Sequence, residues 1–130
     1  MADKRGTHDY VEDIRNSEIL IYINGKFYPR QDASISVFDS GFLLGDGVWE
    51  GIRFDNGKFL FLEKHLERLF WGASQIDMNI GKTIDEITSI LYETTKFNEM
   101  ESGVHVRLIV SRGVKSTPYQ APSFTVSDPT

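Results

Sequence analysis

The sequence lacks cysteine altogether, and this absence excludes several kinds of chemistry. Disulfide bonds, thiolate catalysis and cysteine-ligated zinc each require a thiol side chain. A chain without cysteine suits the reducing cytoplasm, and we expect the protein to be cytoplasmic. An excess of positive charge is also lacking, because the formal net charge is −5 at pH 7. A nucleic-acid-binding surface needs a basic stripe, and so we expect no nucleic-acid partner.

Long apolar segments are absent as well. No stretch of the sequence reaches the roughly 18 apolar residues of a membrane-spanning helix, and we expect no membrane association. The polar segment 1–17 has no apolar centre like that of a signal peptide, and we interpret it as a flexible N-terminal arm. The histidines are scattered along the chain and lack the spacing of metal ligands, so no metal site is predicted.

The composition that remains is typical of a globular domain. The chain has 130 residues, of which 40% are hydrophobic and 25% are charged, and a domain of this size can bury a core. We assign residues 18–122 to this domain. Residues 123–130 begin like a strand and end in a polar sequence with proline, which we interpret as the start of an interdomain linker.

Strands are predicted on both sides of the middle of the sequence. Asn24-Gly25 separates two β-rich runs, and both residues tolerate positive φ, which predicts a hairpin with a two-residue turn. Residues 33–38 alternate small or polar with apolar side chains, as a half-buried strand does. Asn56-Gly57 predicts a second hairpin turn after the glycine-rich segment 42–54. A further strand is expected over residues 104–111.

Two helices are expected in the middle of the sequence. Leu66 and Leu69 belong to an apolar set with helical spacing, which predicts a helix over residues 63–76. Thr83 and Glu86 have the spacing of a capping box and predict the start of a second helix. This order of elements predicts an α+β fold, in which two helices pack on one face of a mostly antiparallel sheet.

Three features of the sequence are candidates for a functional site. Arg68 lies on the first helix without an acidic neighbour on its face, so it is either a solvated arginine or an anchor for a phosphate. The glycine-rich stretch 45–53 is either a bulged strand or a place where backbone approaches a ligand closely. His105 and Arg107 share one face of the last strand. This face is either simply exposed to solvent or suited to bind a carboxylate.

Five motifs in this order resemble the N-terminal domain of class IV (fold type IV) aminotransferases, which depend on pyridoxal 5'-phosphate (PLP). The family includes branched-chain and D-amino acid aminotransferases, R-selective amine transaminases and aminodeoxychorismate lyases. The resemblance extends from Ile19 to Gly113. The motifs lie at residues 22–27, 35–41, 45–53, 65–69 and 106–113.

The resemblance implies roles for particular residues. Arg68 matches the arginine that holds the cofactor phosphate, and Trp49 stands where the family places a Tyr or Phe near the substrate. Arg53 and Arg107 match arginines on the substrate side, and His105 stands where branched-chain enzymes often have Tyr. The resemblance also implies a homodimer that acts on amino acids or amines and 2-oxo acids.

The same resemblance distinguishes between members of the family. The stretch Trp49–Arg53 favours the branched-chain enzymes. The D-amino acid enzymes carry an Arg-x-His carboxylate trap after the last strand, and residues 114–122 contain no such pair.

The family's catalytic lysine is implied to lie in a second domain, beyond Thr130. Without that lysine no group moves the proton from the substrate's Cα, and we expect the 130-residue chain alone to be inactive. Two alternatives stay open. One is a PLP enzyme like aminodeoxychorismate lyase, which shares the fold, and the other is a small binding domain without catalysis.

Overall fold

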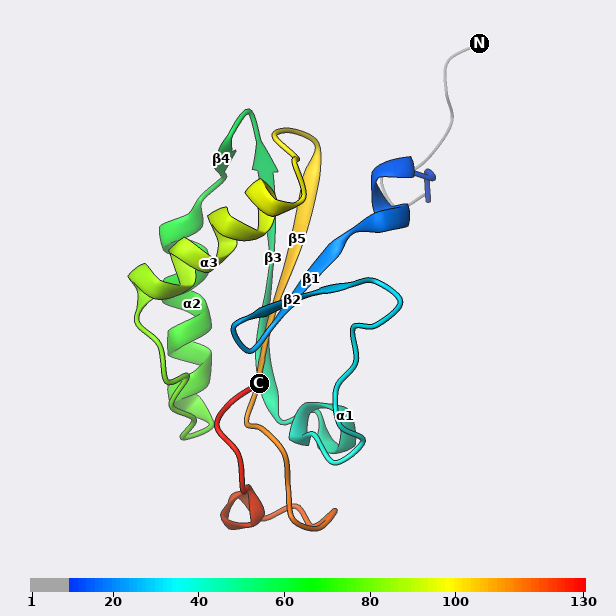
Figure 1. The fold of residues 1–130 in the computed structure, drawn as a ribbon. Coiled ribbons are helices and arrows are strands. Elements are labelled where there is room, and N and C mark those ends of the chain that lie inside the picture. Colours follow the sequence, from blue (N-terminus) through cyan, green and yellow to red (C-terminus); the bar gives the residue numbers. More distant parts are fainter. Residues whose placement is uncertain (1–9) are drawn as a thin grey trace.

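The computed structural model describes residues 10–130 and has an α+β fold (Figure 1). Two strands come first, and two further strands, two helices and a last long strand follow the short helix α1. In chain order they are η1 (Ile14–Glu18), β1 (Leu20–Ile23), β2 (Lys26–Pro29), α1 (Ser40–Leu44), β3 (Gly47–Asp55), β4 (Lys58–Phe59), α2 (Leu62–Gln75), α3 (Ile84–Phe97), β5 (Val104–Ser111) and η2 (Pro122–Phe124).

A long antiparallel ladder between β3 and β5 forms the centre of the fold. The two strands pair continuously, from Gly47 opposite Ser111 to Phe54 opposite Val104. β4 pairs only with the last two residues of β3, on the side away from β5. Within the described part of the chain, that edge of β3 is therefore open along most of its length.

Both predicted hairpin turns are confirmed. Asn24 and Gly25 join β1 to β2 with φ angles of 48° and 89°. Asn56 and Gly57 join β3 to β4 with φ angles of 50° and 76°. Positive φ at both central positions matches the right-handed twist of the flanking strands, which is why Asn-Gly specifies this turn so reliably.

Helices α2 and α3 cover one face of the β3–β5 ladder, which confirms the predicted fold class (Figure 1). The predicted helix 63–76 is shifted by one residue from α2. At the start of α3, Thr83 and Glu86 form the expected reciprocal capping box. The buried apolar core between these layers consists of Ile52, Phe54, Phe59, Leu66, Leu69, Ala73, Met78, Ile80, Ile87, Leu91 and Val110.

The β1–β2 hairpin is attached to the C-terminal end of α3. The Asn98 side chain accepts a hydrogen bond from the Leu20 backbone N–H at 2.7 Å and donates one to the Leu20 carbonyl at 2.9 Å. The rings of Phe27 and Phe97 pack with their centroids 4.6 Å apart. The hairpin is thus anchored to the helical layer although it forms a separate sheet.

The segment expected to be an N-terminal arm lies partly outside the described residues. Its last residues form η1, where Arg15 pairs with Asp13 at 2.7 Å. Arg15 also donates a hydrogen bond to the carbonyl of Ser102 at 2.8 Å. These contacts attach η1 to the loop that precedes β5.

The strand expected over residues 33–38 is wrong. Ile35 and Val37 are exposed, and the segment pairs with no strand of the described chain. Alternation of side chains does not make a strand where no partner strand is available. The segment leads instead into α1, which the Asp39 carboxylate caps by accepting hydrogen bonds from the backbone of Gly41 and Phe42. The strand-like start of residues 123–130 is confirmed only in part. Pro122 opens the short helix η2, and Thr125 then forms an isolated antiparallel bridge with Lys115.

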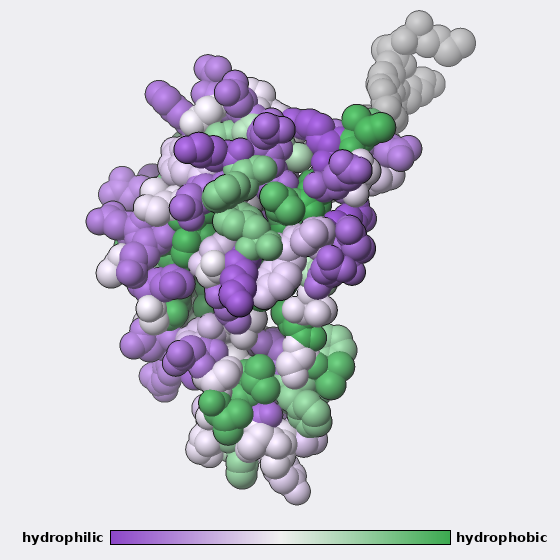
Figure 2. All heavy atoms as spheres, in the orientation of Figure 1, coloured by the Kyte–Doolittle hydropathy of each residue, from purple (hydrophilic) through white to green (hydrophobic). Residues whose placement is uncertain are grey.

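Apolar side chains remain exposed around α1 and the loop before it. Val37, Phe38, Phe42 and Leu44 are all exposed, and Figure 2 shows apolar residues gathered over this end of the molecule. Exposed apolar patches on soluble domains mark interaction surfaces.

Among the described residues, no helix is both long and apolar enough to cross a membrane.

Candidate active site

The exposed face of the β3–β5 ladder carries all four residues predicted to lie near a substrate. Strand alternation places Trp49 and Arg53 on the face away from the helices, and the antiparallel register places His105 and Arg107 beside them. The Arg107 guanidinium carbon lies 4.0 Å from the centroid of the Trp49 ring, which is a cation–π contact. The structure therefore brings these four side chains together on one surface.

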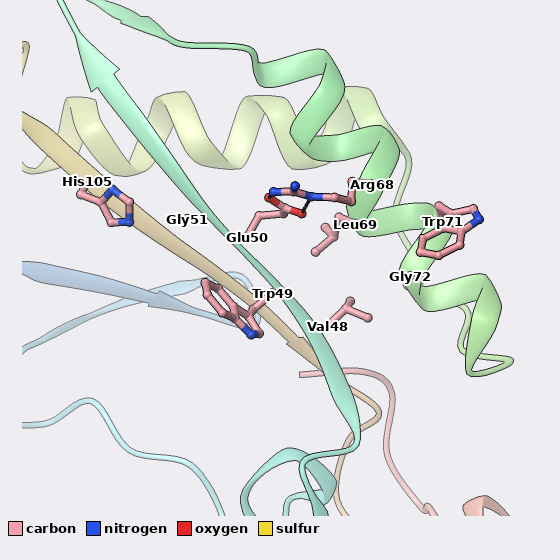
Figure 3. Close-up of a pocket in the computed structure, with 9 residues that line it drawn as sticks. All are labelled: Val48, Trp49, Glu50, Gly51, Arg68, Leu69, Trp71, Gly72 and His105. Atoms are coloured by element: carbon pink, nitrogen blue, oxygen red, sulfur yellow. Dashed lines mark hydrogen bonds and ion pairs between the residues drawn. The ribbon is translucent and has the colours of Figure 1, made fainter.

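An open cavity of about 650 Å³ lies between the free edge of β3 and helix α2 (Figure 3). This volume is within the usual range for small-molecule sites. Trp49 and His105 reach the cavity from the exposed sheet face, and Arg68 reaches it from α2. Arg107 is joined to it through Trp49, whereas Arg53 does not line it. The lining residues are Val48, Trp49, Glu50, Gly51, Arg68, Leu69, Trp71, Gly72 and His105.

Gly51 gives His105 its access to the cavity. A Cβ atom at Gly51 would lie 2.7 Å from Nε2 of His105, a distance that real Cβ contacts do not show. The imidazole thus lies over the backbone of β3 at a position where the side chain is missing. Gly47 is equally restricted by close backbone, since a Cβ there would lie 2.6 Å from the Val110 carbonyl oxygen.

Arg68 is held by a carboxylate that comes from β3 and not from its own helix. Its Nε donates to Oε1 of Glu50 at 2.6 Å, and its Nη2 donates to Oε2 at 2.7 Å. Nδ1 of His65, one turn earlier on α2, lies 2.7 Å from the same Oε2. Figure 3 shows the guanidinium and the carboxylate aligned side by side in this two-point pair.

The remaining donors of Arg68 suit an anionic ligand such as a phosphate. The Arg68 side chain is 68% exposed, and Nη1 makes no hydrogen bond to any residue of the described chain. Arginine has five N–H donors in a planar fork, so the Glu50 pair leaves the outer edge of the guanidinium available. The donor set present at the cavity therefore fits the phosphate of PLP.

Sequence reasoning missed Glu50 as a member of the site, although the sequence contains a signal for it. Positions 48, 52 and 54 of the strand are apolar and face the helices, and Glu50 lies between them on the same face. A carboxylate on a buried face requires a partner, because an unpaired buried charge is strongly unfavourable. The next helix in the sequence offers Lys64, His65 and Arg68 as candidate partners.

The ion pair shifts both pKa values toward the charged forms. The hydrogen bonds from Arg68 hold the pKa of Glu50 below its ordinary value of 4.5, and His65 lowers it further while burial opposes the change. The Glu50 carboxylate in turn raises the pKa of Arg68. The pair is consequently ionised throughout the neutral range.

This shift predicts a pH dependence of stability. Because the folded-state pKa of Glu50 lies below 4.5, its contribution to stability is fully present above that pH and is lost as pH falls through the folded-state value. We expect the unfolding free energy of the wild type to fall more steeply in acid than that of Glu50→Gln. Urea unfolding from neutral pH downward measures both, and parallel pH profiles for the two proteins would contradict the assignment.

A second ion pair fixes the end of α2 and the turn before β3. Nε of Arg112 donates to the Asp46 carboxylate at 2.7 Å, and both side chains are largely buried. The two Nη groups of Arg112 donate to the carbonyls of Ile76 and Asp77, just after the end of α2. These contacts tie the C-terminal end of α2 to the turn that leads into β3.

An open cavity with a fixed arginine and further cations on the adjoining face is the arrangement of a site for a small anionic ligand. Residues 10–130 contain no group of three or more His, Asp or Glu that could hold a metal ion. Residues 47–128 match the family described as amino-transferase class IV, and the chain belongs to that family.

Individual relatives agree with this assignment. The chain is 43% identical over 94 residues to a putative branched-chain-amino-acid aminotransferase of Methanocaldococcus jannaschii, covering 72% of the chain and 32% of the relative. It is 32% identical over 103 residues to a D-alanine aminotransferase of Staphylococcus haemolyticus, covering 79% and 36%. A crystal structure of the branched-chain aminotransferase from the thermophilic archaeon Thermoproteus uzoniensis, with norvaline, matches with a TM-score of 0.67 and 25% identity, covering 80% and 35%. The chain spans about a third of the length of each.

Proposed function

We propose that the protein acts in a PLP-dependent transaminase, which transfers an amino group between an amino acid or amine and a 2-oxo acid. Membership of the amino-transferase class IV family supports this reaction class. The observation that carries the proposal is the orientation of Arg68 at the cavity, with its inner edge on Glu50 and its outer edge available. In this proposal Arg68 anchors the cofactor phosphate.

The other site residues act on the substrate. Arg107 and Arg53 supply positive charge that attracts the carboxylates of amino acids and 2-oxo acids. Trp49 presents an aromatic surface that Arg107 holds in place by stacking on its ring. His105 reaches the cavity over Gly51, where its imidazole meets the substrate from the sheet side. The cofactor, when bound, supplies an electron-accepting ring for the charge that develops at the substrate's Cα.

The lysine that this chemistry requires does not come from the cavity described above. None of the cavity-lining residues in the described chain is a lysine. We propose that the catalytic lysine lies beyond Thr130 and that the 130 residues alone do not transaminate. In this proposal the part of the protein that carries this lysine also supplies the remaining contacts to the cofactor.

Separate observations support the proposed amino donor, the proposed homodimer and the proposed location in the cell. The Trp49–Arg53 stretch, together with the 43% identity to a putative branched-chain enzyme, supports branched-chain amino acids as donors. The exposed apolar surface around α1 supports a homodimer, because such a surface needs a partner. The cysteine-free composition supports a cytoplasmic protein.

The near-visible absorption spectrum of the purified protein, at its full natural length, tests the reaction. We expect an absorption band in the presence of PLP that shifts when L-leucine or L-valine is added, and formation of the corresponding 2-oxo acid. D-alanine and an amine without a carboxylate serve as alternative donors. The proposed reaction is wrong if PLP binds and no donor shifts the band or yields a carbonyl product. A shift with D-alanine alone would assign a different substrate.

A further inference from the structure

Glu50 is a buried carboxylate in an otherwise apolar layer. Glu50 is only 4% exposed, and its neighbours on the same face of β3 include Ile52, which is fully buried. A buried carboxylate is unfavourable for folding, and hydrophobic residues of similar size are often as stable at such positions. Its presence in this layer is explained best by what it does to the groups it contacts.

Both carboxylate oxygens of Glu50 are engaged by α2. Arg68 binds the two oxygens through Nε and Nη2, and His65 binds Oε2 through Nδ1. His65 and Arg68 are three residues apart and so lie on the same face of the helix. His105 and Arg107 of β5 both lie on the opposite face of the ladder, and the residue paired with Glu50 is the apolar Leu108.

This pairing determines where the outer edge of Arg68 points. A two-point contact through Nε and Nη2 fixes both the plane and the rotation of the guanidinium. The side chain is 68% exposed, and without Glu50 it would have the rotamer freedom of any surface arginine. With Glu50 in place, that freedom is already lost in the folded protein and does not have to be lost on ligand binding.

We infer that Glu50 is a positioning residue, which holds the guanidinium of Arg68 so that its outer N–H groups face the phosphate of the cofactor. This inference rests on the proposed function, because it concerns the same phosphate. His65 helps to hold the Glu50 carboxylate in place through its contact with Oε2. The role of Glu50 is thus to prepare Arg68 and not to contact the cofactor.

A purely electrostatic role for Glu50 and a positioning role predict opposite changes in phosphate affinity when its charge is removed. A negative charge close to a phosphate repels it, so removal of that charge without loss of orientation would tighten phosphate binding. Positioning predicts that the same removal weakens binding. The sign of the change in affinity therefore distinguishes the two roles.

The test compares Glu50→Gln with the wild type in the protein at its full natural length. Tryptophan fluorescence reports binding of PLP and of inorganic phosphate, because both tryptophans of the chain, Trp49 and Trp71, line the cavity. We expect PLP and phosphate to bind about 10-fold more weakly to Glu50→Gln, as when an anchoring group loses its pre-orientation. We expect the activity that Glu50→Gln loses at low PLP to recover in large part as PLP is raised to saturation, because the loss lies in cofactor binding and is offset by mass action.

Two further variants make the outcome specific. Glu67→Gln removes the same charge from the exposed side of α2 next to Arg68, has no ion pair within the described residues and is expected to bind PLP like the wild type. Arg68→Ala measures the anchor itself. If Arg68→Ala loses affinity while Glu50→Gln keeps or gains it, the positioning role is wrong and the proposed anchor stands. If Arg68→Ala also binds PLP normally, the proposed anchor is wrong.

A measurement on the wild-type chain keeps the inference testable if Glu50→Gln does not fold. The Nε–H group of Arg68 is expected to give a resolved, slowly exchanging NMR signal, because it donates to a nearly buried carboxylate at 2.6 Å. Inorganic phosphate is expected to shift the Nη signals of Arg68 while the Nε–H signal persists. An Nε–H that exchanges as fast as that of a free arginine would overturn the positioning role.

Discussion

Replacing Arg68 by alanine is expected to weaken PLP binding about 100-fold, because it removes charge-assisted hydrogen bonds to the phosphate. The guanidinium lines the cavity and is the only cation of α2 among the lining residues of the described chain. PLP affinity is measured by fluorescence titration at constant ionic strength, since a phosphate contact is sensitive to salt. Arg68→Lys is expected to recover only part of the affinity, because an ammonium group has no planar fork.

The Arg68→Ala variant needs a control for folding. Loss of the guanidinium leaves Glu50 as a buried carboxylate without its main partner, which is unfavourable by itself. The double variant Arg68→Ala, Glu50→Gln removes that charge as well and is expected to be folded and still weak in PLP binding. Lys64→Ala, which removes an exposed cation from the same helix, is expected to bind PLP normally. Wild-type affinity in the double variant would show that Arg68 is not the anchor.

Replacing Ile52 by alanine is expected to destabilise the 130-residue chain by about 2 to 5 kcal/mol, the range found for buried large-to-small substitutions. Ile52 is fully buried at the centre of β3, beneath Leu66 and Leu69 of α2, which are also fully buried. The loss combines the transfer free energy of the missing methyl groups with the cavity they leave. It is a large fraction of the roughly 5 to 15 kcal/mol that stabilises a domain. Urea unfolding measures it.

Two isoleucine variants on the same ladder calibrate that result. Ile52→Val is expected to lower the unfolding free energy by about 0.5 to 1.5 kcal/mol, since it removes a single methylene. Ile109→Ala changes the same side chain on the opposite face, where the isoleucine is 58% exposed, and is expected to alter stability by less than about 0.5 kcal/mol. Similar losses for Ile52→Ala and Ile109→Ala would mean that the helices do not pack on the face assigned here.

The parts of the fold that were predicted correctly depend on neighbours in the sequence. The Asn24-Gly25 turn has positive φ at both positions because those two residues permit it and the flanking strands require it. The start of α3 is determined by Thr83 and Glu86, which bond to each other's backbone within one helical turn. The prediction of a strand at residues 33–38 failed because a strand needs a partner, and alternation alone does not show whether one is present.

The site was predicted only in part for a related reason. Resemblance to a family singled out Arg68, Trp49, Arg53, His105 and Arg107. The pairing of Arg68 with Glu50 joins residues 18 positions apart, on two different elements, and no local rule connects them. The same holds for the placement of His105 over Gly51, which depends on the register between β3 and β5.

By itself, the sequence determined the turns, the helix start at Thr83, the α+β class and the family, since each depends on local conformational preference or on an ordered set of motifs. The tertiary structure alone decided which faces meet. Alternation along β3 sends Glu50 toward α2 and Trp49 away from it, but only the packing of α2 on that face brings Arg68 within 2.6 Å of the carboxylate. The physical reason is that a buried charge is tolerated only beside a partner, and that partner is supplied by the fold.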